Sequence, residues 1–467
     1  MARAIGIFQK KRSDIDMTEG GIYKNLISFA LPLLAGNLFQ QLYNLVDTWV
    51  IGQTGENGAF AAVGSVGPVI NILIGFFLGL SSGAGVIISQ YFGAKKEKEV
   101  SQVVHTSIMM TLILGVIFTA VGILMTPTLL DLMLRANDSK EEIYPYALTY
   151  LTVYFSGVMG LMVYNMGAGI LRAIGDSKHP FYFLLVSAVT NTVLDLVFVF
   201  VLQMSVMGVA LATIISQFLS AILTLYVLLR NDTCVKLVPS KLKIHWDMLK
   251  KIVRIGIPAA LQMALTAFAN VFVQSYIAGV SVDDQTACLG GWTSYSKVDM
   301  IIFLPVQSLA LASTTFVGQN LCVGNVERAK KGTTAAYLMA TAGAIAIIVP
   351  VIIFAPYIAA LINPDPAVVG YATIFLRYIS PFYLLCCINQ VFAGALRGAG
   401  KTNANMIIML STFVGFRQVY LFIMSNFISN DPIPIGMSYP AGWLACAILT
   451  LIYYKCCKFE KNTVIGD

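Results

Sequence analysis

Three acidic residues lie deep inside long apolar stretches of the sequence: Asp47, Asp195 and Asp299. A charge at the centre of a bilayer costs about 2.5–3.5 kcal/mol on insertion scales, so such residues are rare and usually functional. The membrane-embedded parts of the first half contain no Lys or Arg, which leaves Asp47 and Asp195 without a local basic partner. We therefore expect a proton, a metal ion or a cationic substrate to take that place.

The second half of the chain carries intramembrane charges of both signs. Asp299 lies two residues after Lys297, and two further basic residues, Arg377 and Arg417, also fall inside apolar stretches. For Asp299 a structural pairing with Lys or Arg is therefore the simpler interpretation.

The acid of the first apolar stretch belongs to a polar helix face. Gln40, Tyr43, Asn44 and Asp47 are spaced by three or four residues, so they share one side of a helix. Polar side chains on one face of a spanning helix must look into protein or water and not into lipid. We expect Gln40, Tyr43 and Asn44 to line a substrate cavity, together with two residues of another span, Tyr164 and Asn165.

The second acid, Asp195, shares a helix face with Asn191, four residues earlier, and Thr213 lies in the next span. If these helices converge on Asp47, the four side chains offer carboxylate, carbonyl and hydroxyl oxygens, which suit a hard cation such as sodium. Two carboxylates in a low-dielectric environment also repel each other, so that one of them favours a proton. Sodium and the proton both remain candidates, and no other metal is expected.

The bulk composition fits a polytopic membrane protein. Of the 467 residues, 57% are apolar and 11% are charged, against roughly 25% charged residues in a soluble domain. The mean hydropathy is +0.78. A spanning helix needs about 20 mostly apolar residues. The sequence predicts an all-α protein with twelve spans, near 22–51, 58–92, 103–126, 145–171, 180–202, 208–229, 250–279, 286–321, 333–362, 367–396, 404–428 and 436–455.

The basic residues predict the topology. With twelve spans, 25 of the 30 Lys and Arg residues fall in the tails and in the loops on the same side as the tails, and only Arg135 and Lys140 fall in loops on the other side. The positive-inside rule then places both termini in the cytoplasm. The net charge of +7 is thereby explained by topology, and no nucleic-acid partner is expected. Residues 1–19 lack the apolar core of a cleavable signal peptide.

The chain divides into two similar halves. The longest polar stretch between spans separates an N-lobe (22–230, spans 1–6) from a C-lobe (248–455, spans 7–12); a linker (231–247) joins them, and tails (1–21 and 456–467) flank them. Six spans per half predict a parallel repeat, which is a transporter architecture. The matching residues are Pro32 and Pro258, Asn44 and Asn270, Gln90 and Gln319, and the segments LRAIG (171–175) and LRGAG (396–400).

Motifs of enzymes are missing from the sequence. The eight Cys residues show no metal-binding spacing, and the three His residues fall at span ends or in loops. There is no phosphate-binding loop, HExxH motif or nucleophile elbow in a suitable context. We expect no cofactor and no enzymatic activity.

Four segments resemble the multidrug and toxic compound extrusion (MATE) family: PLLAGNLFQQLYNLVDTWVIG in span 1, NTVLD in span 5, and the turns LRAIGDSK and LRGAGKTN. The resemblance covers nearly the whole chain. It implies an antiporter that exports amphipathic, often cationic, organic compounds in exchange for Na⁺ or H⁺ by alternating access. It also implies that the set Asp47, Asn191, Asp195 and Thr213 is the N-lobe cation site of the DinF-like branch, and that span 1 bends at Pro32.

The sequence departs from other branches of that family. NorM-like and eukaryotic members use an acidic residue in span 7, but residues 250–279 contain no Asp or Glu. Some members carry an Asp in span 10, and residues 367–395 contain none. Coupling is therefore expected to concentrate in the N-lobe.

The expected partners are small organic molecules, the coupling cation and membrane lipids. We expect a monomer in the cytoplasmic membrane of a bacterium. Two other transporter functions stay open, a dedicated metabolite exporter and a lipid-linked flippase, for which Lys297, Arg377 and Arg417 would supply basic residues. A non-transporting receptor or scaffold is the alternative from a different class, and it would not need acids inside the spans.

Overall fold

The computed structural model describes residues 15–54, 57–134 and 140–457, and these residues form helices and connecting turns without a strand. Most of both tails and Arg135 lie outside the described residues. Twelve helical segments are long and apolar enough to cross a membrane, which confirms the predicted number. Their bounds agree with the predicted spans to within several residues, and α8 begins at Trp246, inside the predicted linker.

The first six spans are α2 (Ile22–Gly52), α3 (Asn57–Gly93), α4 (Glu97–Met133), α5 (Lys140–Ala173), α6 (Lys178–Leu196) continued by the π-helix η2 (Val197–Val201), and α7 (Ser205–Arg230). A short 3₁₀ turn, η3 (Pro239–Lys241), lies in the linker.

The second six spans are α8 (Trp246–Ala278), α9 (Gln285–Cys322), α10 (Val326–Ile353), α12 (Pro366–Ile379) with η4 (Ser380–Phe382) and α13 (Tyr383–Gly398), α14 (Thr402–Leu410) with η5 (Ser411–Phe416), α15 (Arg417–Ile423) and η6 (Met424–Ile428), and α16 (Pro432–Gly436) with α17 (Ser438–Cys456). A short helix, α11 (Ala355–Ile362), follows α10.

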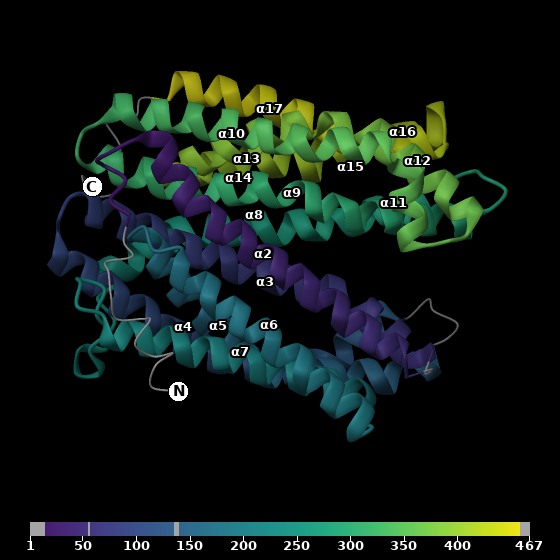
Figure 1. Cartoon of the computed structure of the whole chain (residues 1–467), viewed down its shortest axis with the longest axis horizontal. Coiled ribbons are helices and arrows are strands. Elements are labelled where there is room, and N and C mark those ends of the chain that lie inside the picture. The colour runs from purple at the N-terminus through teal and green to yellow at the C-terminus, as the bar shows by residue number, and fades with distance from the viewer. Residues whose placement is uncertain (1–14, 55–56, 135–139, 458–467) are drawn as a thin grey trace.

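The helices form two lobes that share a seam. Figure 1 shows α4 to α7 gathered on one side and α9 to α17 on the other, with α2, α3 and α8 between them. The first helix of each half bridges the seam: α2 packs on α6 of its own half and on α9 of the other, while α8 packs on α14 of its own half and on α3 of the other. The two halves are thus related by the same pattern of contacts, as the repeat predicts.

Small residues let α3 and α8 approach closely across the seam. A Cβ atom added to Gly83 would lie 2.3 Å from the Cα of Gly256, and one added to Gly79 would lie 2.4 Å from the Cα of Ala260. Helices in lipid associate mainly through packing, which close backbone contact of this kind favours.

The repeated LRAIG and LRGAG segments end their helices in the same way. Gly175 and Gly400 have φ angles of 93° and 76°, which favour glycine because it has no Cβ. The N–H of the next residue, Asp176 or Lys401, donates to the carbonyl oxygen five positions earlier, at 3.0 and 2.9 Å. This is the hydrogen-bond pattern of a Schellman C-cap. The sequence repeat therefore marks equivalent helix ends in the two lobes.

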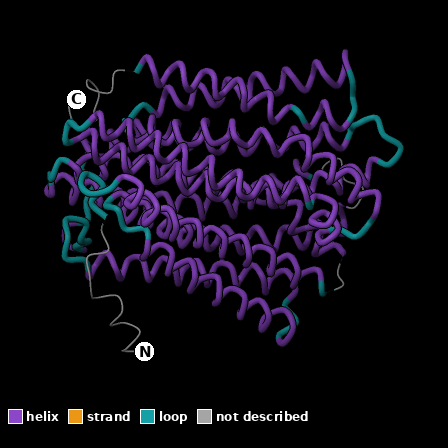
Figure 2. Tube along the Cα trace, turned by 45° about the horizontal axis from the view of Figure 1, so that its top comes forward, coloured by secondary structure: helices purple, strands orange, loops and turns teal. Residues whose placement is uncertain are grey.

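Two glutamines tie the lobes together beside these turns. Gln90 Nε2 of α3 donates to Gly398 O in the second half at 2.9 Å, and Gln319 Nε2 of α9 donates to Ala173 O in the first half, also at 2.9 Å. The N–H of Met17 donates to Gln319 Oε1 at 3.1 Å. We call this end of the molecule, with the turns at 94–96, 174–177, 323–325 and 399–401 and the linker, the basic end. Figure 2 shows the loops gathered at the two ends of the helices.

Candidate functional site

Helices α2 and α6 bring the two predicted acids together. Asp47 is 9% exposed and Asp195 is 0% exposed, and their carboxyl groups interact with each other. Within the described part of the chain, Asp47 Oδ1 and both carboxylate oxygens of Asp195 have no hydrogen-bond donor. No Lys or Arg nitrogen of that part forms an ion pair with either acid. The pair is therefore a buried acidic site whose oxygens remain available to a ligand.

Asn191 and Thr213, the other two predicted residues, lie on the neighbouring helices α6 and α7. Ser187 Oγ of α6 donates to Ser216 O of α7 at 3.0 Å, and this bond sets the register of the two antiparallel helices. Asn191 follows Ser187 by one turn on α6, and Thr213 precedes Ser216 by three residues on α7. The nitrogen and the oxygen of the Asn191 amide are buried without a hydrogen-bond partner among the described residues, and the Thr213 hydroxyl donates to Val209 O at 2.9 Å. The amide oxygen and the lone pairs of the hydroxyl stay available as acceptors.

The structure adds two tyrosines that the sequence analysis missed. Tyr150 and Tyr154 of α5 are buried with stacked rings, 6.3 Å apart, and Tyr150 interacts with both acids. Tyr43 of α2 also interacts with Asp47. The four-residue spacing of the two tyrosines, on the same helix face as Asn165, is a periodic signal that could have identified them. Phenol groups of α2 and α5 therefore lie near the acid pair.

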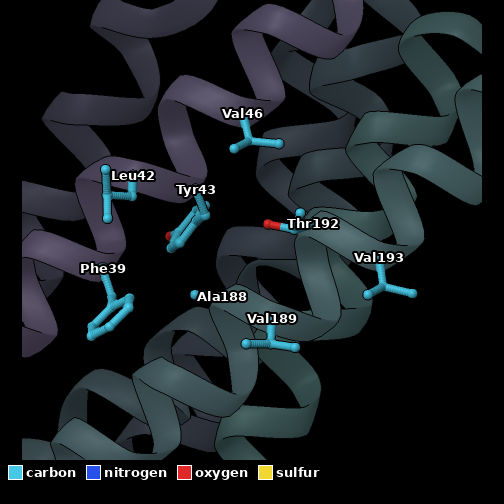
Figure 3. A pocket seen from close by; sticks show the side chains of 8 residues that line it. All are labelled: Phe39, Leu42, Tyr43, Val46, Ala188, Val189, Thr192 and Val193. Carbon is cyan, nitrogen blue, oxygen red and sulfur yellow. The ribbon is translucent and has the colours of Figure 1, made fainter.

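The predicted cavity residues of α2 differ in exposure. Tyr43 lines a hollow of about 210 Å³ between α2 and α6, where its ring and the side chain of Thr192 point into the gap from the two helices (Figure 3). Most other residues of the hollow are apolar, among them Phe39, Val46 and Val189. Gln40 is half-buried, and Asn44 is exposed.

The two predicted cavity residues of α5 lie inside the N-lobe. Tyr164 and Asn165 are both buried. The Tyr164 hydroxyl donates to Pro180 O at 3.5 Å, and Asn165 Nδ2 donates to Leu161 O at 2.9 Å. Their polar groups are thus engaged with the main chain, while Tyr164 also lies close enough to Tyr43 to interact with it.

Pro32 lies inside α2, and the helix continues on both sides of it. Proline lacks the N–H that would bond the preceding turn and its ring crowds the carbonyl four residues earlier, so it is a weak point of a helix. Pro258 occupies the matching place inside α8. Both bridging helices therefore carry a proline in the half nearer the basic end.

The intramembrane charges of the second half are spread out. Lys297 and Arg377 are exposed, Asp299 is half-buried and Arg417 is buried. Asp299 accepts a hydrogen bond from the Tyr295 hydroxyl at 3.5 Å, and among the described residues it forms no ion pair with a base. The structure therefore does not gather these four residues into one site.

The donor set of the N-lobe site suits a proton or a hard monovalent cation. The described residues contain no group of three or more His, Cys, Asp or Glu side chains arranged to hold a metal ion. Two carboxylates with amide and hydroxyl oxygens are oxygen donors throughout, which hard cations prefer.

Comparison with known families identifies the repeat. The family model MatE matches residues 32–197 and again residues 258–423. The chain belongs to the MatE family. The two matched segments fall in the two lobes and start at Pro32 and Pro258, so each lobe is one copy of the MatE unit.

Relatives and solved structures agree with this assignment. The chain is 27% identical over 440 residues to the probable multidrug resistance protein YpnP of Bacillus subtilis, covering 94% of this chain and 96% of that protein. It is 24% identical over 396 residues to a FAD transporter of Shewanella oneidensis, covering 83% and 85%. A structure described as the outward-facing conformation of a multidrug resistance MATE family transporter matches with a TM-score of 0.88 at 24% identity, over 96% of this chain and 98% of that one. The chain is thus a twelve-span membrane protein of a multidrug efflux family.

Proposed function

We propose that this MatE protein exports amphipathic organic compounds in exchange for a cation, and that Asp47 and Asp195 take up that cation. The supporting observation is the pair of buried, interacting carboxyl groups without a basic partner among the described residues. Two unit charges 4 Å apart repel by about 4 kcal/mol at an effective dielectric constant of 20. A sodium ion or a proton relieves this repulsion, and so binding favours the conformation that holds the acids together.

The bridging position of α2 connects this site to the lobes. Because α2 packs on α6 and also on α9, a shift of α2 on ion binding alters a contact between the lobes. Pro32 weakens α2 in the half nearer the basic end, 15 residues before Asp47. Alternating access then follows as rocking of the two lobes, with the cation and the exported compound favouring different states. If the ion weakens binding of the compound, the compound weakens ion binding equally.

The direction of export follows from the proposed orientation. The positive-inside rule supports our proposal that the basic end and both termini face the cytoplasm. The glutamine contacts close the seam at that end, so the structure corresponds to a state closed to the cytoplasm. We propose that the protein acts as a monomer in a bacterial cytoplasmic membrane, with all coupling residues in one chain and no cofactor.

The test of coupling compares Asp47→Asn with the unmodified chain in proteoliposomes that carry an imposed ion gradient. Gradient-driven efflux of a fluorescent organic cation is expected to fall to background in the variant at equal protein content. Asp131→Asn is the matched control, because Asp131 is exposed on α4 and bonds Lys140 at 2.9 Å, away from the site. Normal efflux by Asp47→Asn would remove this residue from the mechanism.

The coupling ion is identified by separating the two gradients. A sodium gradient at constant pH and a pH gradient without sodium are imposed in turn on the unmodified chain and on Asp195→Asn. We expect one gradient to drive efflux by the unmodified chain and the variant to lose at least part of that response. If Asp195→Asn responds to both gradients as the unmodified chain does, Asp195 has a structural role and does not bind the coupling ion.

A dedicated metabolite exporter is the second candidate. It is supported by the relative named as a FAD transporter, which the chain covers over 85% of its length. Efflux of flavin compounds at a higher rate than organic cations would favour this candidate.

A further inference from the structure

Arg417 lies at an interruption of span 11. The span changes from α14 to the π-helix η5 (Ser411–Phe416), returns to the α-helix α15 at Arg417, and changes again to the π-helix η6 (Met424–Ile428). π-helical turns are rare and occur frequently at functional sites. The backbone therefore departs from regular geometry at the position of the buried charge.

The guanidinium of Arg417 is buried with unused donors. The residue is 2% exposed. Its Nη2 donates to Asn270 Oδ1 of α8 at 2.9 Å, whereas its Nε has no acceptor in the described part of the chain. The aromatic ring of Tyr439 lies 4.9 Å from the guanidinium carbon and that of Phe413 lies 5.8 Å away. Guanidinium offers five N–H donors, so one hydrogen bond and two ring faces leave most of this capacity open.

No acid neutralises this cation. Among the described residues, no carboxylate forms an ion pair with Arg417. Asp299, the acid of span 8, accepts its hydrogen bond from the Tyr295 hydroxyl instead. A buried charge without a partner is costly, and an intramembrane ionisable residue is a functional-site candidate. The ligand that such a cation lacks is an anion.

The internal repeat relates the position of Arg417 to the acidic site of the N-lobe. Asn270 of α8 is the counterpart of Asn44 of α2, and spans 7 and 11 are the counterparts of spans 1 and 5. In the first half these two spans carry Asp47 and Asp195. In the second half they carry no acid at the corresponding level, and an arginine occupies the site instead. Equivalent sites in the two lobes therefore have opposite charge.

Two residues beside the buried guanidinium are exposed. Asn270 is exposed, and Phe416, next to Arg417 in the chain, is 46% exposed. A ligand oxygen can replace the Asn270 oxygen as the acceptor of the Arg417 Nη2 bond. The Nε–H of Arg417, which has no acceptor among the described residues, can then bond a second oxygen of the same ligand group. Planar guanidinium binds carboxylate and phosphate groups through two parallel bonds.

We propose that Arg417, together with Asn270, binds a carboxylate or phosphate group of the exported compound, so that the substrates are zwitterionic or anionic amphiphiles. This inference rests on the proposed export function and specifies its substrate class. The acidic N-lobe site takes the coupling cation, and the basic C-lobe site takes the anionic group of the cargo.

The test uses two dyes that differ at one group, tetramethylrhodamine with a free carboxylate and its methyl ester. Their binding to the purified full chain in maltoside micelles is measured by fluorescence anisotropy. We expect the unmodified chain to bind the carboxylate dye roughly tenfold more tightly than the ester. Arg417→Gln is expected to abolish this preference by weakening binding of the carboxylate dye. Arg377→Gln, which changes an exposed arginine of the same lobe, is the matched control and should keep the preference.

The outcomes of this binding experiment separate the anion site from the export function. Equal binding of both dyes by the unmodified chain, or a preference that survives in Arg417→Gln, would overturn the assignment and leave the export function standing. Absence of binding of either dye would count against the export function as well. If Arg417→Gln does not fold, Arg417→Lys serves in its place. An ammonium group cannot form the two parallel bonds of a guanidinium, so the preference for the carboxylate dye should fall at least about threefold. An unchanged preference in that variant would overturn the assignment.

A lipid headgroup could supply the same phosphate chemistry. Phosphatidylglycerol is therefore added to the micelles in a second arm. We expect it to leave binding of the carboxylate dye unchanged. Displacement of the dye from the unmodified chain would assign the site to a lipid and overturn its assignment to the cargo.

Discussion

The lobes are held together at the basic end by a small number of buried hydrogen bonds, and removing one residue should open that end. Gln319 is 0% exposed, donates to Ala173 O of the first half and accepts from the N–H of Met17. Gln319→Met keeps the length and approximate volume of the side chain and removes both bonds. It thereby leaves one carbonyl and one N–H buried without partners in the closed state.

The expected effect follows from these two groups. Each buried polar group that loses its partner costs about 1–3 kcal/mol, and water satisfies both groups once the end opens. At the lower value the closed state loses about 2 kcal/mol, which corresponds to roughly a 30-fold shift towards the open state. The equivalent bond from Gln90 to Gly398 remains, so the lobes should still close for part of the time.

Hydrogen–deuterium exchange of the purified chain measures this opening. Exchange should accelerate in the turn at 399–401, which Gln319 does not touch, as well as around Met17. Gln274→Met is the control, because Gln274 is an exposed glutamine of α8. Faster exchange confined to Met17 would mean that only a local bond was lost. That outcome would refute the conclusion that Gln319 holds the two lobes together.

Three further predictions concern packing, the acid pair and the linker. Gly83→Val places a side chain against Gly256 across the seam, so the protein should unfold at a lower temperature or fail to accumulate in the membrane; a melting temperature equal to that of the unmodified chain would contradict the close approach. Tyr150→Phe removes a phenol beside the acids and should change the apparent affinity for the coupling ion several-fold at an unchanged protein level, whereas identical ion titrations would exclude a role. His105 accepts a bond from Val238 N–H of the linker at 3.0 Å, so His105→Ala should make the linker more sensitive to proteolysis, and equal cleavage rates would show that this contact does not hold it.

The membrane architecture and the acids of the N-lobe could be predicted from local sequence properties. Length and hydropathy specify a spanning helix because lipid requires every backbone group to be bonded within it. Polar residues that recur every three or four positions then specify one face of a helix. Asp47 and Asp195 can therefore be identified as candidate site residues without knowing which other helices pack against them. The repeated glycine turns were equally visible, since a left-handed C-cap restricts the residue type.

The tertiary structure decided which of these faces meet. Tyr150 and Tyr154 join the acids only because α5 packs beside them, and Gln319 bonds Ala173 only because the lobes are closed. Arg417 was visible as an intramembrane charge, but its bond to Asn270, its distance from any acid and the π-helices around it depend on how distant spans pack and rotate. Hydrophobic periodicity carries no information on such pairings, because lipid and protein interior are both apolar. Local sequence thus specifies the spans, the repeat and the charged residues, whereas packing between spans specifies which side chains surround each charge.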